Sequence, residues 1–173
     1  MGKNNFVFRK ANIKDLRSIL ELNLKLFKKE YEEFDKIINL SWTYGDGKKY
    51  FRGRITKKDG FSEVIEYKNK IIGYLCGGRR KKLPYWKKAQ YVEIESFFLE
   101  KKFRNKGLGS RLIRDFIDWC KEKRIDYAFL SASAQNLPAI RLYKKFGFNS
   151  RDCQLILNLN NISKCRLKNV PEQ

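Results

Sequence analysis

Two glutamates and a basic, glycine-bearing loop are the residues of this chain whose types and spacing suit chemistry. Glu93 and Glu95 are two positions apart in the stretch 91–99, so on a β-strand their carboxylates point to the same face. The R-x-x-G-x-G motif of residues 104–109 follows directly and opens an amphipathic segment. The first amides of a helix lack intrahelical partners and lie at the positive end of its dipole, so they attract anions. The pattern predicts a phosphate-binding loop with acid–base chemistry beside it.

The loop also admits a plainer interpretation. Gly107 and Gly109 let the backbone approach a phosphate closely, but glycines are common where a helix begins, and a glycine motif alone has low specificity. The preceding strand, with its two carboxylates, favours the functional interpretation. The cations around the loop are Lys101, Lys102, Arg104 and Lys106.

Residues 91–112 resemble the acyl-CoA-binding motif of the GNAT superfamily of N-acetyltransferases, written Q/R-x-x-G-x-G/A. The segment 136–148, with Asn136, Tyr143 and a terminal Gly-Phe, resembles the second GNAT motif. The resemblance implies that the chain uses acetyl-CoA as a co-substrate, without a metal. It also implies direct attack, in a ternary complex, by a primary amine on a protein N-terminus, a lysine or a small polyamine-like acceptor.

The resemblance assigns particular residues to the cofactor. The end of the strand would pair with pantetheine like an additional strand, the loop would cradle the pyrophosphate, and the asparagine of the second motif would contact pantetheine or cap its helix. The residues assigned in this way are Phe97, Phe98, Leu99, Arg104, Asn105, Lys106, Gly107, Leu108, Gly109, Ser110, Asn136 and Ala139.

Acetylating an amine is easier with a general base, because only about one in 2,500 lysine-like amines is neutral at pH 7. Glu95 falls where polyamine-type acetyltransferases carry a glutamate, and Glu93 falls where histone-type enzymes carry theirs. We expect Glu95 first, and at least one of the two to be a strand-surface residue paired with a lysine. Position five before the motif asparagine is Ser131, where ribosomal-type enzymes carry a catalytic glutamate, which weakens that subclass.

Tyr143 is the expected general acid, which would protonate the departing thiolate of coenzyme A. Its position within the second motif carries this expectation, and a core tyrosine on a helix face is the alternative.

The acceptor site is expected near the first two helices, as in the family. That region combines acidic and aromatic side chains, which suit a cationic amine. Solvated helix charges and core aromatics are the alternative. The residues concerned are Glu30, Glu32, Glu33, Asp35, Trp42, Tyr44, Tyr50 and Phe51.

Length and composition limit the classes of protein. A chain of 173 residues with 42% hydrophobic residues suits one folded domain, expected over residues 1–160, with a C-terminal tail over 161–173. It has no histidine, which excludes histidine-based triads and ligands, and its four cysteines lack C-x-x-C spacing, which disfavours zinc.

The net charge of +20 could attract nucleic acid or a ribosome, but the cations are spread along the chain. A basic nucleic-acid- or ribosome-associated protein on an acetyltransferase fold is therefore a second hypothesis that we do not favour, and an acyl-CoA sensor without turnover is a third. No apolar run or leader suggests a membrane, so we expect a cytoplasmic protein, with a homodimer left open because relatives commonly dimerise.

The pattern of apolar residues predicts an α/β (α+β) order of elements that matches a GNAT fold. We expect a mixed central β-sheet of six to seven strands flanked by helices on both faces, with a turn at 44–47 and a hairpin turn at 68–70. The expected strands are 6–10, 62–67, 71–77, 90–99, 126–132 and 154–160; the expected helices are 12–34, 35–40, 108–123 and 136–146.

Overall fold

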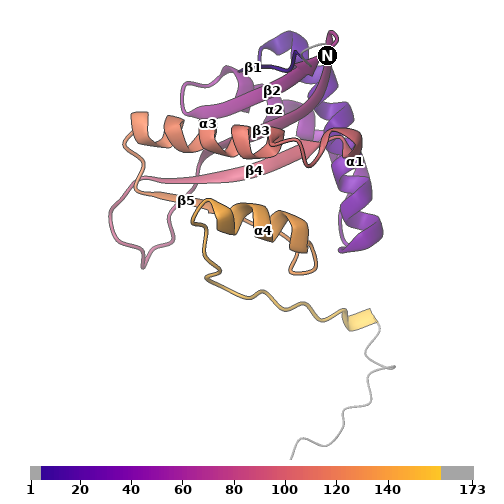
Figure 1. Cartoon of the computed structure of the whole chain (residues 1–173). Helices are drawn as coiled ribbons and strands as arrows, with labels where there is room; N and C mark the ends of the chain where they lie inside the picture. Colours follow the sequence, from indigo (N-terminus) through magenta and orange to yellow (C-terminus); the bar gives the residue numbers. More distant parts are fainter. Residues whose placement is uncertain (1–4, 161–173) are drawn as a thin grey trace, which may run out of the picture.

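The alternating apolar segments form one mixed sheet in the order β1-β2-β3-β4-β5 (Figure 1). The first four strands pair antiparallel, and β4 pairs with β5 in parallel. The computed structural model describes residues 5–160. The strands are β1 (Val7–Lys10), β2 (Gly60–Tyr67), β3 (Lys70–Arg79), β4 (Tyr91–Leu99) and β5 (Tyr127–Leu130).

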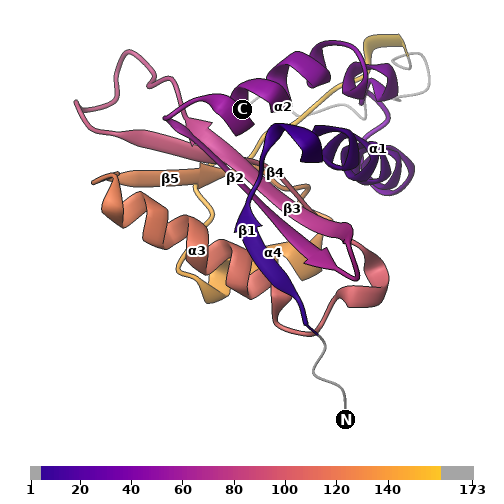
Figure 2. The same cartoon turned by 90° about the horizontal axis from the view of Figure 1, so that it is seen from above.

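Helices cover both faces of this sheet, which confirms that part of the prediction (Figure 2). One face carries α1 (Leu16–Glu33) and α2 (Asp46–Thr56), and the other carries α3 (Leu108–Glu122) and α4 (Leu137–Lys145). Short 3-10 turns connect them: η1 (Ile13–Asp15), η2 (Leu40–Thr43) and η3 (Lys101–Phe103).

Each face has its own hydrophobic core. Under α3, the apolar side of β4 packs through Val92 and Ile94 against Leu112 and Phe116. Under α1 and α2, the buried ring of Phe51 is packed edge-on against Tyr74 of β3. Because these cores fix β4 from both sides, the side chains of β4 are held in defined positions.

The structure confirms the predicted helix cap at Asn12, the turn at 68–70 and the helix end at Gly147. The side chain of Asn12 accepts a hydrogen bond from the amide of Lys14 and forms a capping box with Asp15, so α1 begins after this cap. Lys68 and Asn69 have positive φ in the β2–β3 turn, and Gly147 has φ +86 after α4.

The predicted number of six to seven strands is wrong, because the described residues form five. Residues 154–160 were expected as a strand, but they pair with no other segment between residues 5 and 160, and a strand is stable only when its backbone groups are paired. The apolar side chains that suggested a strand are exposed, from 63% to 89%: Leu155, Ile156, Leu157 and Leu159. The predicted tail, 161–173, lies outside the described residues.

The second predicted helix, 35–40, is also wrong, since the structure places α2 at residues 46–56 instead. The turn predicted at 44–47 overlaps the start of α2: Gly45 is its N-cap and Gly47 lies within it, and glycine is a poor helix former. Gly47 has a packing reason: a Cβ there would lie 2.8 Å from the carbonyl oxygen of Trp42.

Candidate functional site

A β-bulge in β4 creates the site. Cys76 pairs with Ser96 and Gly77 with Ile94, so Glu95 is an extra residue in β4. On its other edge, β4 pairs with β5 only from Tyr91 to Ile94. Beyond Ile94 the two strands separate, and the edge of β4 from Glu95 to Leu99 pairs with no described strand.

A cavity of about 420 Å³ occupies this separation, a volume typical of small-molecule sites. Its lining includes residues of α1 and of the N-terminus of α3. These two elements lie at the same end of the sheet (Figure 1). Twelve of the residues singled out from the sequence line it: Glu95, Phe97, Phe98, Leu99, Arg104, Asn105, Gly107, Gly109, Ser110, Asn136, Ala139 and Tyr143. Glu93, Lys106 and Leu108 do not, and Leu108 is buried in the core.

The loop before α3 has the backbone that an anion site needs. Asn105 and Gly107 both have positive φ, of 61° and 78°, which turns the chain sharply into the first turn of α3. A Cβ on Gly109 would lie 3.1 Å from the ring of Phe97, so a glycine keeps the loop close to β4. Arg104 donates from Nε to the carbonyl of Leu99 at 2.9 Å, which fixes the end of the strand.

Both candidate bases are ion-paired with arginines. Arg54 of α2 donates from Nη2 to Oε1 of Glu95, whereas Oε2 of Glu95 is buried and accepts no hydrogen bond from the described residues. Arg80 donates from Nη1 to Glu93 at 2.5 Å. The expected pairing with a lysine is therefore wrong for both glutamates, and Glu95 alone of the two borders the cavity.

Tyr143 lies in the wall of the cavity, 9% exposed, with its ring packed edge-on against Phe97 and Phe148. Burial raises the pKa of its hydroxyl above the usual value, and the negative charge of Glu30 raises it further. The hydroxyl is therefore protonated at neutral pH and able to donate a hydrogen bond. Asn136 caps α4, because its side chain accepts from the amide of Ala139 at 3.4 Å.

A buried polar network supports β4 beside the bulge. The hydroxyls of Tyr74 and Ser96 are 2.6 Å apart, and the side-chain Nδ2 of Asn23 donates to both. The hydroxyl of Thr43 donates to the side-chain Oδ1 of Asn23 at 2.9 Å. These four residues tie β3, β4, α1 and η2 together directly behind the cavity, so the bulge is held in place by hydrogen bonds as well as by packing.

Sequence reasoning missed the partners of the two glutamates. Arg54 belongs to α2, a helix that was not predicted. Arg80 is one of a run of cationic residues that resembles an ordinary solvated face. No local pattern marks either residue, since each pairing joins segments distant in the chain. Ser131, singled out as a departure from one subclass, does border the cavity.

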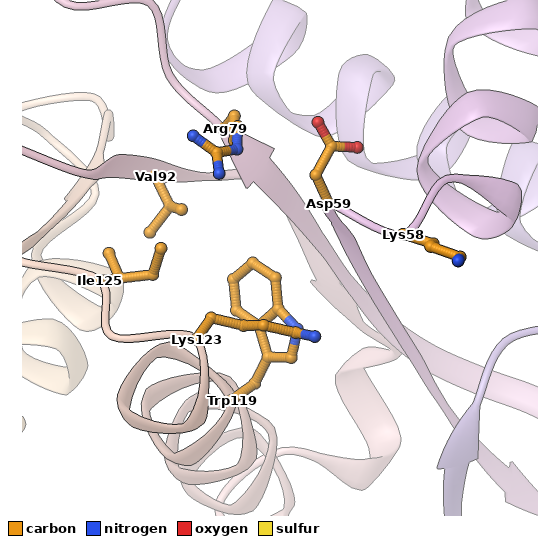
Figure 3. A pocket seen from close by; sticks show the side chains of 7 residues that line it. All are labelled: Lys58, Asp59, Arg79, Val92, Trp119, Lys123 and Ile125. Carbon is orange, nitrogen blue, oxygen red and sulfur yellow. The ribbon is translucent and has the colours of Figure 1, made fainter.

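A second pocket, of about 260 Å³, lies apart from this cavity and shares no lining residue with it. Figure 3 shows Val92, Ile125 and the ring of Trp119 on its apolar side. The charged residues around it are Lys58, Asp59, Arg79 and Lys123. None of the predicted site residues lies here.

No helix within residues 5–160 is long and apolar enough to cross a membrane. The same part of the chain contains no group of three or more histidine, cysteine, aspartate or glutamate side chains arranged to hold a metal ion.

Comparison with known proteins gives a family match over most of the chain. The model of the acetyltransferase (GNAT) family matches residues 18–148. An uncharacterized N-acetyltransferase of Methanocaldococcus jannaschii is 28% identical over 152 residues, which cover 85% of this chain and 62% of that protein. The spermine/spermidine N(1)-acetyltransferase of Bacillus subtilis is 31% identical over 88 residues, 49% of this chain and 56% of that enzyme. The chain thus spans little more than half the length of these relatives.

Among solved structures, the PaiA N-acetyltransferase of Thermoplasma acidophilum, in complex with coenzyme A, has a similar fold. The TM-score is 0.73 with 20% sequence identity, and the match covers 87% of this chain and 93% of that one.

Proposed function

The chain belongs to the acetyltransferase (GNAT) family, and we propose that it is an N-acetyltransferase that transfers the acetyl group of acetyl-CoA to a primary amine. The single observation that carries this proposal is the cavity at the bulge of β4. It brings the glycine loop, the unpaired strand edge, Glu95 and Tyr143 to one place, although they come from distant parts of the chain.

The residues of the cavity fit acetyl-CoA. The first-turn amides of α3, with Arg104 beside them, suit the anionic pyrophosphate. No strand in the described part of the chain pairs with Phe97, Phe98 and Leu99 on the β5 side, so their backbone can pair with the amides of pantetheine. Asn136 and Ala139 border the same space.

Acetyl-CoA supplies an activated thioester, whose carbonyl carbon the acceptor nitrogen attacks while the carbon–sulfur bond breaks. In our proposal the Tyr143 hydroxyl gives its proton to the departing thiolate. Glu95 accepts the proton lost by the amine, through water, with Arg54 fixing the direction of the carboxylate. Glu95 is preferred to Glu93 because only Glu95 borders the cavity. Backbone amides at the end of β4 would stabilise the negative oxygen that develops.

The acceptor that we propose is a cationic amine, such as a polyamine-like molecule, a lysine or a protein N-terminus. A B. subtilis relative is named as a spermine/spermidine acetyltransferase, and one acidic residue of α1, Glu30, borders the same cavity as Tyr143.

The proposal is tested by thermal unfolding with acetyl-CoA and with free coenzyme A. At about 100 times its dissociation constant, a ligand stabilises the folded state by about 2.7 kcal/mol, which a melting curve detects readily. Gly109→Val should abolish the shift, because the new side chain would project between the loop and Phe97. Gly53→Ala is the matched control, since a Cβ there meets only the end of Lys57, 3.9 Å away.

Each variant is compared with its own melting temperature without ligand, so that a general loss of stability is not mistaken for lost binding. Unchanged melting of the wild-type protein at millimolar acetyl-CoA would contradict the proposed function.

A further inference from the structure

One acidic side chain of α1 enters the cavity, and the other three candidates do not. Of the four acidic residues expected near the acceptor, only Glu30 borders the cavity. Glu32 is exposed, Glu33 is paired with Lys29 at 3.0 Å, and Asp35 accepts a hydrogen bond from the amide of Ile37. Of the four carboxylates, one therefore borders the cavity and three lie on the surface.

The Glu30 carboxylate borders the cavity without an ion-pair partner among the described residues, since the neighbouring Lys29 is paired with Glu33. Within residues 5–160 its side chain makes no hydrogen bond and no ion pair, although its backbone carbonyl accepts from the amides of Phe34 and Asp35. By contrast, Glu93 and Glu95 are both held by arginines. Although the chain has 39 lysines and arginines and only 19 acidic residues, Glu30, like Glu63, is a partly buried carboxylate without an ion pair in residues 5–160.

The surroundings of Glu30 disfavour its negative charge. Burial raises the pKa of the Glu30 carboxyl, Lys29 lowers it, and Asp35 raises it. Taken together, the pKa lies above the ordinary value. A cation beside the carboxylate would relieve this penalty.

Glu30 and Tyr143 border the same cavity from opposite elements, α1 and α4, and the charge of Glu30 acts on the Tyr143 hydroxyl. Next to Glu30 along this wall lies Phe27, whose ring stacks on Trp42 with centroids 5.6 Å apart. An aromatic wall beside a carboxylate suits an alkyl ammonium group, whose methylenes pack on rings while its charge is paired.

We propose that Glu30 is the residue that binds the ammonium group of the acceptor, and that it selects a cationic amine over a neutral one. The acceptor would lie along Phe27, with one nitrogen kept charged beside Glu30 and a second, neutral nitrogen free to attack the thioester. This inference rests on the proposed function, because it assigns the second substrate of the same cavity.

The test measures binding without turnover, using spermidine as the probe and free coenzyme A to fill the cofactor site. Titration calorimetry on the wild-type protein should detect spermidine binding, and Glu30→Gln should weaken it about tenfold or more, the cost of losing one charge-assisted contact. Glu32→Gln is the matched control, because it removes the same charge from the exposed face of the same helix. This control should bind spermidine as the wild-type protein does.

Stabilisation by acetyl-CoA should be the same in Glu30→Gln as in the wild-type protein. Equal binding of spermidine by Glu30→Gln and Glu32→Gln, or no binding by the wild-type protein, would overturn the assignment of Glu30. The proposed function would still stand in either case, because it fails only if the wild-type protein is not stabilised by acetyl-CoA.

Discussion

Individual side chains of the site differ in how far the sequence reveals them. Tyr143 and Glu95 stand at motif positions, and the structure brings both to one cavity. Glu93 stands at the second-ranked motif position, and it is paired with Arg80 and does not border the cavity. The choice between the two glutamates depends on the one extra residue in β4, and no pattern of residue types announces a bulge.

The role of Tyr143 can be tested by removing its hydroxyl alone. Tyr143→Phe should lower kcat about 100-fold, because a positioned general acid contributes at least that much to such reactions. The hydroxyl forms no hydrogen bond with the described residues, so the melting temperature and the stabilisation by acetyl-CoA should change little. Steady-state kinetics with a cationic amine provides the measurement. Tyr44→Phe, on an exposed ring, is the control, and full activity of Tyr143→Phe would remove Tyr143 from the mechanism.

Helices and strands were predicted well where one face is apolar. They were predicted poorly where a glycine interrupts the apolar face, or where apolar residues are exposed to solvent. The period of α3 places Leu112, Ile113 and Phe116 in the core, as its sequence indicates. In α2 the buried positions Gly47, Phe51 and Ile55 also recur every four residues, but a glycine among them hides the pattern. For 154–160, apolar residues indicated a strand, yet a strand depends on a partner that local sequence does not specify.

The contact between β2 and α3 makes stability depend on pH. Burial and the nearby charge of Asp115 raise the pKa of Glu63 from 4.5 to about 7, and one oxygen of Glu63 accepts no hydrogen bond from the described residues. Between these two values the folded state keeps a proton that the unfolded state releases. The free energy of unfolding therefore falls as pH rises from about 4.5 to about 7.

Glu63→Gln should remove this pH dependence and stabilise the protein above pH 7. We expect a gain of about 1 kcal/mol at pH 8, after allowing for solvent screening of a half-exposed group. Urea unfolding at about pH 5 and pH 8 measures it. Glu122→Gln, on an exposed position of α3, should behave as the wild-type protein does. A wild-type protein whose stability is equal at the two pH values would contradict this account.

At the scale of the whole molecule, the order of elements follows from the sequence more reliably than the site does. The mixed sheet, its helices on both faces and the loop before α3 all agree with expectation. Composition does not reveal what the net positive charge does. Two of the 39 cationic side chains, Arg54 and Arg80, form ion pairs with Glu95 and Glu93, and many others are exposed.

The exposed leucines and isoleucine of 155–159 have a consequence for how the protein behaves in solution. Exposed apolar side chains promote self-association, whereas a net charge of +20 makes the molecules repel one another. Salt shortens the reach of that repulsion from about 10 Å at 0.1 M to about 3 Å at 1 M, and it leaves the apolar attraction in place. We therefore expect the protein to self-associate as ionic strength rises. Light scattering should detect growing particles of the wild-type protein in concentrated salt and none for Ile156→Ser/Leu157→Ser; equal scattering would assign the attraction to another surface.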